Sequence, residues 1–249
     1  LLTKDDTKDG RILIDRWQVA AGHDLEISIA PGTLAWLQVL GGEVSLGGES
    51  VSADTITRLP APFEASIHAS RQADILISQV PEARRFGQLP SNGALVQKSF
   101  DWTREPVLQS AHDDRKRIYI ATKSLFESTA LKGEMVIYPA GATCPEHHHE
   151  GAEHYQFIIN GEGVAWIDGV EETLRAGDVL YNFENEHHWF RNEGDEEFSF
   201  VEYFVPGTCK TVWAPGADIC EWLPTGADIR GREPSRHIPQ HSHGDQTPL

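Results

Sequence analysis

The chain has 249 residues, of which 39% are hydrophobic and 9% aromatic; this composition suits one or two packed domains and excludes a disordered protein. Its 38 acidic residues outnumber 21 lysines and arginines, and the formal net charge of −17 would repel nucleic acid and anionic membrane surfaces. No run of eighteen apolar residues predicts a membrane-spanning helix. The three cysteines lack the spacing of a disulfide framework, which favours a reducing, cytoplasmic compartment.

Short apolar runs separated by turns follow one another along almost the whole chain. Pro-Gly at 31–32 and Gly-Gly at 41–42 and 47–48 are typical of tight turns between strands. Helical periodicity is nearly absent, so helix is expected only in short pieces, around residues 99–104 and 110–116. Strands about 8–12 residues apart predict an all-β barrel or sandwich. The strand candidates in chain order are residues 11–15, 25–29, 34–40, 43–46, 73–77, 117–121, 133–138 and 198–204.

The two halves of the chain repeat one pattern, an apolar strand that enters a glycine turn from which a second strand leaves. Residues 34–44 carry this pattern in the first half and residues 155–163 in the second. In the first half His23 and His68 stand alone, whereas histidines cluster in the second half. The pattern predicts a tandem repeat whose first copy lacks a metal site. The expected segments are a degenerate domain at 1–80, a linker at 81–114, a metal-binding domain at 115–222 and a C-terminal extension at 223–249.

The extension differs in composition from the rest of the chain, because Gly, Pro and Ser replace the apolar runs. It contains His237, His241 and His243. Two interpretations are open for it: an accessory metal-binding tract, or a strand-free segment that lies on the barrel surface. The composition favours the second interpretation.

Six histidines fall within 42 residues of the second half, in two separate clusters. Side chains alternate along a strand, so His147 and His149 point to one face and His148 to the other. Two histidines on one strand and a third from a distant strand form a pattern typical of a divalent metal site with three or four protein ligands. We therefore expect His147, His149 and His188 to hold an ion, and His148 and His187 to point away from it.

The second half resembles the cupin family through two motifs. The first, Gly-x5-His-x-His-x3,4-Glu-x6-Gly, and the second, Gly-x5-Pro-x-Gly-x2-His-x3-Asn, are occupied by Gly141, His147, His149 and Gly161, and by Gly177, His188 and Asn192. Phe183 and Asn185 stand where the second motif has Pro and Gly, so the turn before His188 must be built differently. The resemblance implies a bicupin, with two tandem double-stranded β-helix (jelly-roll) barrels of which the first is degenerate. Association into a homodimer through a barrel edge is expected, since exposed sheet edges promote pairing.

The acidic position of the first motif has two candidates. A spacing of three residues after His149 selects Glu153, with a small bulge, and a spacing of four selects His154. Glu153 shares a strand face with Tyr155, the more apolar face, and a carboxylate would reduce the charge of the ion. These arguments favour Glu153. If His154 is the ligand, the centre is all-histidine, as in some cupins that use oxygen.

The resemblance implies a metal-dependent enzyme that acts on a small-molecule substrate. The favoured hypothesis is a non-heme iron dioxygenase with Fe²⁺, and Mn²⁺, Ni²⁺ and Zn²⁺ are alternative ions. The runner-up is a lyase or isomerase, because the motifs also resemble those of cupin dimethylsulfoniopropionate lyases. In that case Tyr155 or Tyr181 would be the catalytic base for a β-elimination. A non-catalytic, ligand-binding cupin is the third hypothesis.

Overall fold

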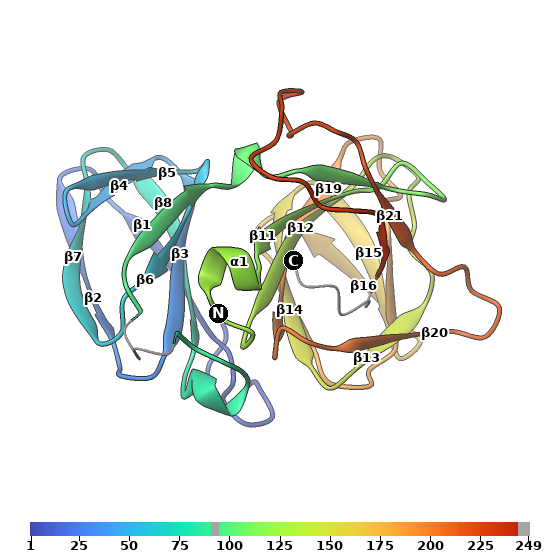
Figure 1. The fold of residues 1–249 in the computed structure, drawn as a ribbon, viewed down its shortest axis with the longest axis horizontal. Helices are drawn as coiled ribbons and strands as arrows, with labels where there is room; N and C mark the ends of the chain where they lie inside the picture. The colour runs from blue at the N-terminus through green and yellow to red at the C-terminus, as the bar shows by residue number, and fades with distance from the viewer. Residues whose placement is uncertain (91–94, 244–249) are drawn as a thin grey trace. The chain divides into compact units, whose positions relative to one another are not determined.

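The computed structural model describes residues 1–90 and 95–243, most of them in antiparallel strands and the turns between them (Figure 1). The chain divides into two compact units: unit 1 holds residues 1–103 and 125–130, and unit 2 the remainder. The all-β prediction is confirmed, since α1 (Lys123–Phe126) is the single α-helix of the described residues. No helix in this described part of the chain is long and apolar enough to cross a membrane.

Unit 1 consists of two antiparallel sheets. One has the order β1-β8-β3-β6-β9 and the other β2-β7-β4-β5. The strands are β1 (Leu13–Val19), β2 (His23–Ile29), β3 (Leu34–Gly41), β4 (Glu43–Leu46), β5 (Glu49–Ser52), β6 (Thr55–Leu59), β7 (Phe63–Ala69), β8 (Ala73–Val80) and β9 (Lys98–Asp101).

The short segment 125–130 belongs to unit 1 because Phe126 is buried in that unit's core. The ring of Phe126 packs edge-on against Trp36, with 6.2 Å between ring centroids, and both side chains are fully buried. Arg58 is fully buried as well, and its guanidinium donates to the Phe126 carbonyl at 2.6 Å and pairs with Glu127 at 2.8 Å. A buried guanidinium needs such partners, so this charge is structural.

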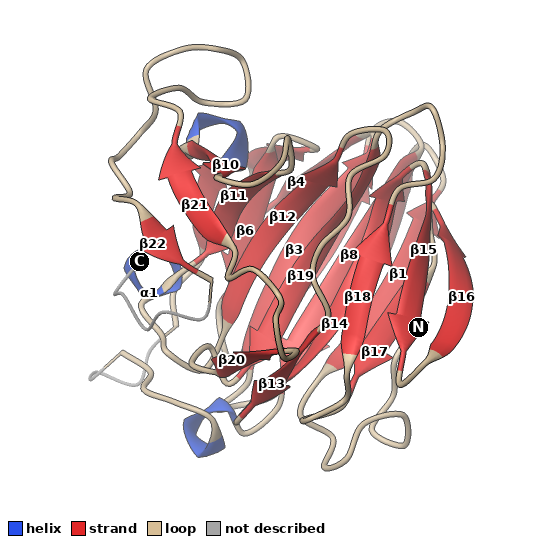
Figure 2. Cartoon of the chain, turned by 90° about the vertical axis from the view of Figure 1, so that its right-hand side faces the viewer, coloured by secondary structure: helices blue, strands red, loops and turns tan. Residues whose placement is uncertain are grey.

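Unit 2 is built from a larger pair of antiparallel sheets (Figure 2). Their orders are β17-β14-β19-β12-β11-β10-β21-β22 and β16-β15-β18-β13-β20. The strands are β10 (Val107–Ser110), β11 (Lys116–Ala121), β12 (Lys132–Tyr138), β13 (His147–Glu150), β14 (Glu153–Asn160), β15 (Glu162–Ile167), β16 (Val170–Arg175), β17 (Val179–Asn182), β18 (His188–Arg191), β19 (Phe198–Val205), β20 (Lys210–Trp213), β21 (Glu221–Pro224) and β22 (His241–Ser242).

The two sheets of unit 2 share one hydrophobic core. Ile158 and Phe200 come from the first sheet, and Ala165 and Phe190 from the second, and all four are buried in one cluster. Burial of apolar side chains from both inner faces stabilises such a sandwich by roughly 25 cal/mol per Å² of buried apolar surface. The histidines of β13 and β18 lie in the second sheet, so the core also fixes the position of the metal motif.

Segments expected to be connections contribute strands instead. The expected linker 81–114 contains β9, which pairs with β6, and β10, which pairs with β11 and β21. The helices expected at 99–104 and 110–116 are wrong: residues 98–101 are β9, Trp102–Arg104 is a single 3₁₀ turn, and residues 111–115 form bends and an extended stretch. Strands of four residues are too short to show periodicity, which explains these errors.

The C-terminal extension is not strand-free, as its composition had suggested. Its β22 pairs with β21, with Trp222 opposite His241, and Ile238 joins a buried cluster with Leu108 and Tyr119. His241 and His243 are both buried. The extension is therefore part of the wall of unit 2 up to the last described residue, His243.

Candidate metal centre

Four histidines from three strands of unit 2 converge on one place. His147 and His149 project from the same face of β13, and His188 begins β18 directly opposite His147. His154 lies on β14, in the facing sheet. The ring centroids of His147 and His188 are 4.5 Å apart, and those of His149 and His154 are 4.9 Å apart. None of the four side chains is more than 7% exposed, so the cluster is shielded from solvent.

The nitrogen atoms of this cluster match the requirements of a divalent ion. One ligand atom from each of His149, His154 and His188 lies within 4.8 Å of the others. Nε2 of His149 and of His188 and both ring nitrogens of His154 are buried and accept or donate no hydrogen bond among the described residues. Nε2 of His154 is 3.3 Å from Oε1 of Glu202, which is its nearest ionisable neighbour. Buried polar atoms are rarely left in this state, and a metal ion would satisfy them.

Backbone carbonyls orient two of the rings. Nδ1 of His147 donates to the Pro145 carbonyl at 2.8 Å, and Nδ1 of His188 donates to the Glu186 carbonyl at 2.9 Å. A carbonyl only accepts, so in the neutral ring the proton lies on Nδ1 and the lone pair of Nε2 is free to bind a cation. Nδ1 of His149 forms a hydrogen bond with the Thr211 hydroxyl at 3.2 Å. Such contacts hold metal ligands in position.

Burial keeps these imidazoles in the neutral form that binds metal. Desolvation lowers the pKa of His147, His149 and His154 well below the usual 6.5, and neighbouring histidines lower it further. Desolvation lowers the pKa of His188 to about 4. At neutral pH the four rings are therefore uncharged, and no proton competes with a cation for their lone pairs.

Glu153 and His154 are both fully buried but project to opposite faces of β14. His154 faces His149 and His188, whereas Glu153 accepts a hydrogen bond from the Tyr181 hydroxyl and belongs to no candidate metal group. The more apolar face of β14, with Glu153 and Tyr155, is therefore the face that does not contact His149 and His188. Both faces of this strand are buried, so apolarity could not indicate which of them faces the ion.

The two tyrosines expected to supply a base lie apart from the metal cluster's pocket. Tyr155 is on the same face of β14 as Glu153 and stacks on Tyr203, with 5.4 Å between centroids. Tyr181 donates to Glu153, as described above. Neither hydroxyl is among the groups that line the cavity next to the histidines.

His148 and His187 lie together on the other face, with ring centroids 4.6 Å apart. Nδ1 of His187 pairs with Glu146 at 2.9 Å in a half-exposed position. Neither residue contributes to a candidate metal group among the described residues. This position follows from strand alternation, which turns them away from His147, His149 and His188.

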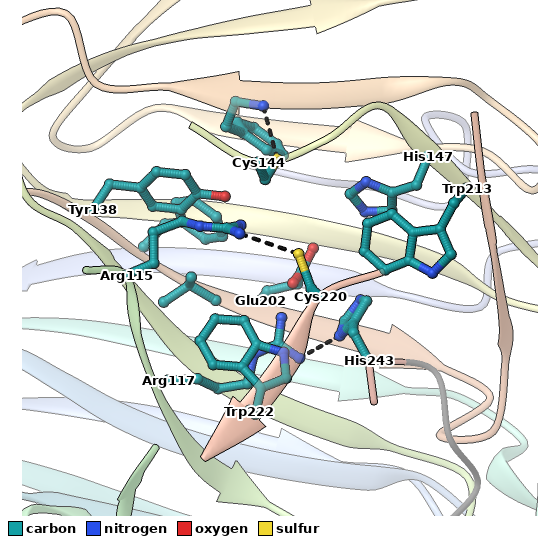
Figure 3. Close-up of a pocket in the computed structure, with 13 residues that line it drawn as sticks. Arg115, Arg117, Tyr138, Cys144, His147, Glu202, Trp213, Cys220, Trp222 and His243 are labelled. Carbon is teal, nitrogen blue, oxygen red and sulfur yellow. Dashed lines mark hydrogen bonds between the residues drawn. The ribbon is translucent and has the colours of Figure 1, made fainter. Parts of the chain in front are cut away.

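Sequence reasoning missed a cavity that adjoins the cluster (Figure 3). The cavity is narrow, with a volume of about 20 Å³, which is room for one water-sized molecule, and His147 forms one of its walls. Arg115 and Arg117, two positions apart in the sequence, line one side of the cavity. His243 reaches it from the C-terminal extension. The available signal was Arg115 and Arg117 on either side of Lys116, at the start of an apolar strand, since charged side chains are rarely buried without a function or a partner. The remaining lining residues are Val136, Tyr138, Cys144, Phe190, Phe200, Glu202, Trp213, Cys220 and Trp222.

Comparisons with known proteins agree with this architecture. Residues 134–223 match the cupin domain family. The chain superposes over 85% of its length on 74% of an oxalate decarboxylase variant from Bacillus subtilis, with a TM-score of 0.64 and 18% identity. An alignment of that extent covers residues of both units. The chain therefore has the two-barrel fold of a bicupin. The resemblance predicted from the two histidine motifs is confirmed.

The bicupin also matches two curated proteins over part of its length. The oxalate-binding protein of Thermotoga maritima is 24% identical over 113 residues, which are 45% of the bicupin and 93% of that protein. The polyketide synthase CurC of Streptomyces cyaneus is 32% identical over 72 residues, 29% of the bicupin and 47% of that protein. A second structure of the Bacillus subtilis decarboxylase, solved in a study of its Mn(II) centres, has a TM-score of 0.62 at 17% identity.

Proposed function

We propose that the bicupin is a metal-dependent enzyme that holds one divalent ion in unit 2 on His147, His149, His154 and His188. The proposal is supported by Nε2 of His149, of His154 and of His188, which are buried without a hydrogen-bond partner among the described residues and belong to one candidate metal group. His147 completes the set, because its ring lies 4.5 Å from that of His188 and 5.0 Å from that of His149. A bound ion would supply Lewis-acid or redox chemistry to a substrate in the adjoining cavity.

Fe²⁺ is the preferred ion, and Mn²⁺, Ni²⁺ and Zn²⁺ are the alternatives. Four neutral imidazoles suit each of these first-row ions, so the ligand set does not select among them. The Mn(II) centres studied in the Bacillus subtilis decarboxylase favour manganese as the first alternative. Elemental analysis of protein purified anaerobically without added metal will identify the ion.

With iron bound, we propose that the bicupin oxidises a small chelating organic substrate with dioxygen. An all-imidazole site contributes no negative charge, so an anionic substrate with two oxygen donors would complement the ion. The test is oxygen consumption by Fe²⁺-loaded protein with a panel of catechols, diketones and hydroxyaromatic acids. Oxygen uptake that depends on both iron and one of these compounds supports a dioxygenase. If none of the compounds causes oxygen uptake, the dioxygenase proposal is wrong.

A redox-neutral decarboxylation is the second candidate, since the structural neighbours described above are oxalate decarboxylases and a curated relative is an oxalate-binding protein. In this reaction a carboxylate leaves as CO₂ and a proton replaces it, with no net oxidant. The two candidates differ in their need for oxygen. Release of CO₂ from oxalate or a related acid without oxygen consumption supports decarboxylation, and oxygen uptake in proportion to turnover supports the first candidate.

The same chain is proposed to form a homodimer through a sheet edge. β17 ends one sheet of unit 2, and β16 and β20 end the other, so each presents backbone groups to a partner. Light scattering during size-exclusion chromatography distinguishes a 27.7 kDa monomer from a particle of twice that mass.

A further inference from the structure

The cavity beside the metal cluster has a polar side formed by β11 and the C-terminal extension (Figure 3). We propose that it is a carboxylate-binding subsite, in which Arg115, Arg117 and His243 present hydrogen-bond donors next to the ion. We call these three residues the anion subsite. The inference rests on the proposed metal centre and specifies which group of the substrate lies beside it.

Arg115 is a buried cation at the wall of the cavity, and the guanidinium has five N–H donors. Its side chain is 3% exposed, and its Nε donates to both carboxylate oxygens of Asp113 at 3.0 and 2.9 Å. Nη2 also donates to the thiol of Cys220 at 3.1 Å, which is a weak acceptor. The rings of Tyr138 and Trp222 lie 5.5 and 5.7 Å from the guanidinium carbon and hold it in place.

Arg117 determines which nitrogen of His243 carries the proton. Arg117 is 5% exposed, lies 3.3 Å from Glu134 and is stacked over Trp222 at 4.2 Å. Its Nη1 donates to Nδ1 of His243. A guanidinium only donates, so a neutral His243 accepts at Nδ1 and carries its proton on Nε2. His243 then acts as a donor within the cavity rather than as a metal ligand.

His243 lies beside the centre and forms a second candidate metal group with His147 and His149. One of its ring nitrogens lies within 4.8 Å of ligand atoms of His147 and His149, and its ring centroid is 5.6 Å from that of His149. Arg115 and His243 approach the cavity from different sides in Figure 3. Two donors that converge from different elements match the two oxygens of a carboxylate.

The extension holds His243 in place through several contacts. The Tyr119 hydroxyl donates to Nε2 of His241 at 2.7 Å, whose Nδ1 donates to the Pro239 carbonyl at 2.9 Å. The backbone N–H of His243 donates to the Cys220 carbonyl at 2.8 Å. These contacts are present without a ligand, so the side chain of His243 loses little conformational entropy when a ligand binds.

With a divalent ion bound, the net charge around the cavity is positive and favours an anionic ligand. The ion would contribute +2 on neutral imidazoles, while the charges of Arg115 and Arg117 are offset by Asp113 and Glu134. Glu202 is the one carboxylate among the described lining residues, and even when ionised it leaves +1. A buried excess charge is unfavourable, and a carboxylate ligand would neutralise it.

The test measures binding of oxalate and malonate to full-length, Zn²⁺-loaded and metal-free protein by titration calorimetry. Arg115→Met removes the guanidinium and keeps the length of the side chain, and His243→Phe keeps a ring but removes the donor. Lys116→Met and His237→Phe are matched controls, because both positions are exposed neighbours on the same elements. We expect roughly tenfold or greater loss of affinity in the first two variants, from the loss of a charge-assisted hydrogen bond, and no change in the controls.

Metal content and melting temperature are measured for every variant. Equal oxalate affinity in all five proteins at full metal content would overturn the anion subsite. Loss of zinc from His243→Phe would also overturn it, because His243 would then be a ligand and not a donor. If Arg115→Met does not fold, the comparison of His243→Phe with His237→Phe decides. Wild-type protein that binds no metal would end the proposed function instead, and the comparison in metal-free protein would still decide whether Arg115 and His243 bind the anion.

Discussion

At the scale of single residues, the chemistry of a histidine here depends on what its ring nitrogens contact. His68 in unit 1 is half exposed and its Nδ1 pairs with Asp24 at 2.7 Å. Nε2 of His149 is buried with no hydrogen-bond partner in the described residues. The imidazole of His68 is satisfied by solvent and a carboxylate. The buried Nε2 of His149 either binds a cation or remains without a polar partner, which is energetically unfavourable.

Removal of a ligand imidazole is therefore expected to empty the centre. His149→Ala and His188→Ala are expected to lower bound metal from about one ion per chain to less than a tenth of that, because the other imidazoles cannot complete the coordination. His68→Ala is expected to retain the wild-type amount. Elemental analysis after gel filtration measures the three contents, and equal metal in all three variants would refute the centre.

The choice between Glu153 and His154 has its own pair of variants. His154→Ala is expected to lose the ion, since its ring faces His149 and His188. Glu153→Gln is expected to keep it, because the amide can still accept from the Tyr181 hydroxyl. Retention of metal in the first variant and loss in the second would return Glu153 to the ligand set.

The stability of the metal-free protein is expected to depend on pH through the same histidines. The pKa of His188 is about 4 in the folded chain because burial disfavours its charged form, against 6.5 as its usual value. Between these values the unfolded chain binds a proton that the folded chain does not, so stability falls as the pH decreases from 6.5 towards 4. Urea unfolding at pH 7 and pH 5 measures the difference. His188→Phe is expected to reduce it, and an unchanged difference in that variant would contradict the assignment.

At the scale of elements, two glycine turns connect consecutive strands of unit 2. Gly161 connects β14 to β15 at φ +76°, and a Cβ there would lie 2.2 Å from the Glu197 carbonyl oxygen. Gly169 connects β15 to β16 at φ +82° with no atom within 4 Å of such a Cβ. Both turns need the left-handed conformation, but only the first also needs the missing side chain.

These two glycines make a matched pair of variants. Gly169→Ala is expected to cost about 1 kcal/mol, the usual penalty for a left-handed residue with a Cβ. Gly161→Ala is expected to cost at least twice as much, because the backbone of residues 197–198 must also move. Thermal unfolding of both variants measures the difference, and equal melting temperatures would show that the contact at Gly161 is relieved at no cost.

At the scale of the whole molecule, the candidate metal ligands are distributed unevenly between the two units. Both candidate metal groups of the described residues lie in unit 2, and the histidines of unit 1 remain single. A ligand that binds only the folded state stabilises it in proportion to the logarithm of its concentration. A metal ion is therefore expected to stabilise unit 2 selectively.

Calorimetric unfolding with and without a chelator tests this expectation. At a free metal concentration of about 100 times the dissociation constant, the stabilisation is about 2.7 kcal/mol. The transition that moves with metal is expected to move in wild-type protein and to stay fixed in His149→Ala. A metal-dependent shift that persists in that variant would place the ion elsewhere.

The sequence by itself determined the all-β class, the bicupin repeat and the segments that carry the histidines. It could do so because strand alternation and motif spacing are local properties, readable along a few residues such as His147 and His149. Which face of β14 lies beside His149 and His188, that of Glu153 or that of His154, was decided only by tertiary structure, because both faces are buried. The same holds for Arg115, Arg117 and His243, which are up to 128 positions apart (243 minus 115) and meet only after the extension pairs with β21. Contacts at such separation depend on which strands become neighbours, and no local pattern records that.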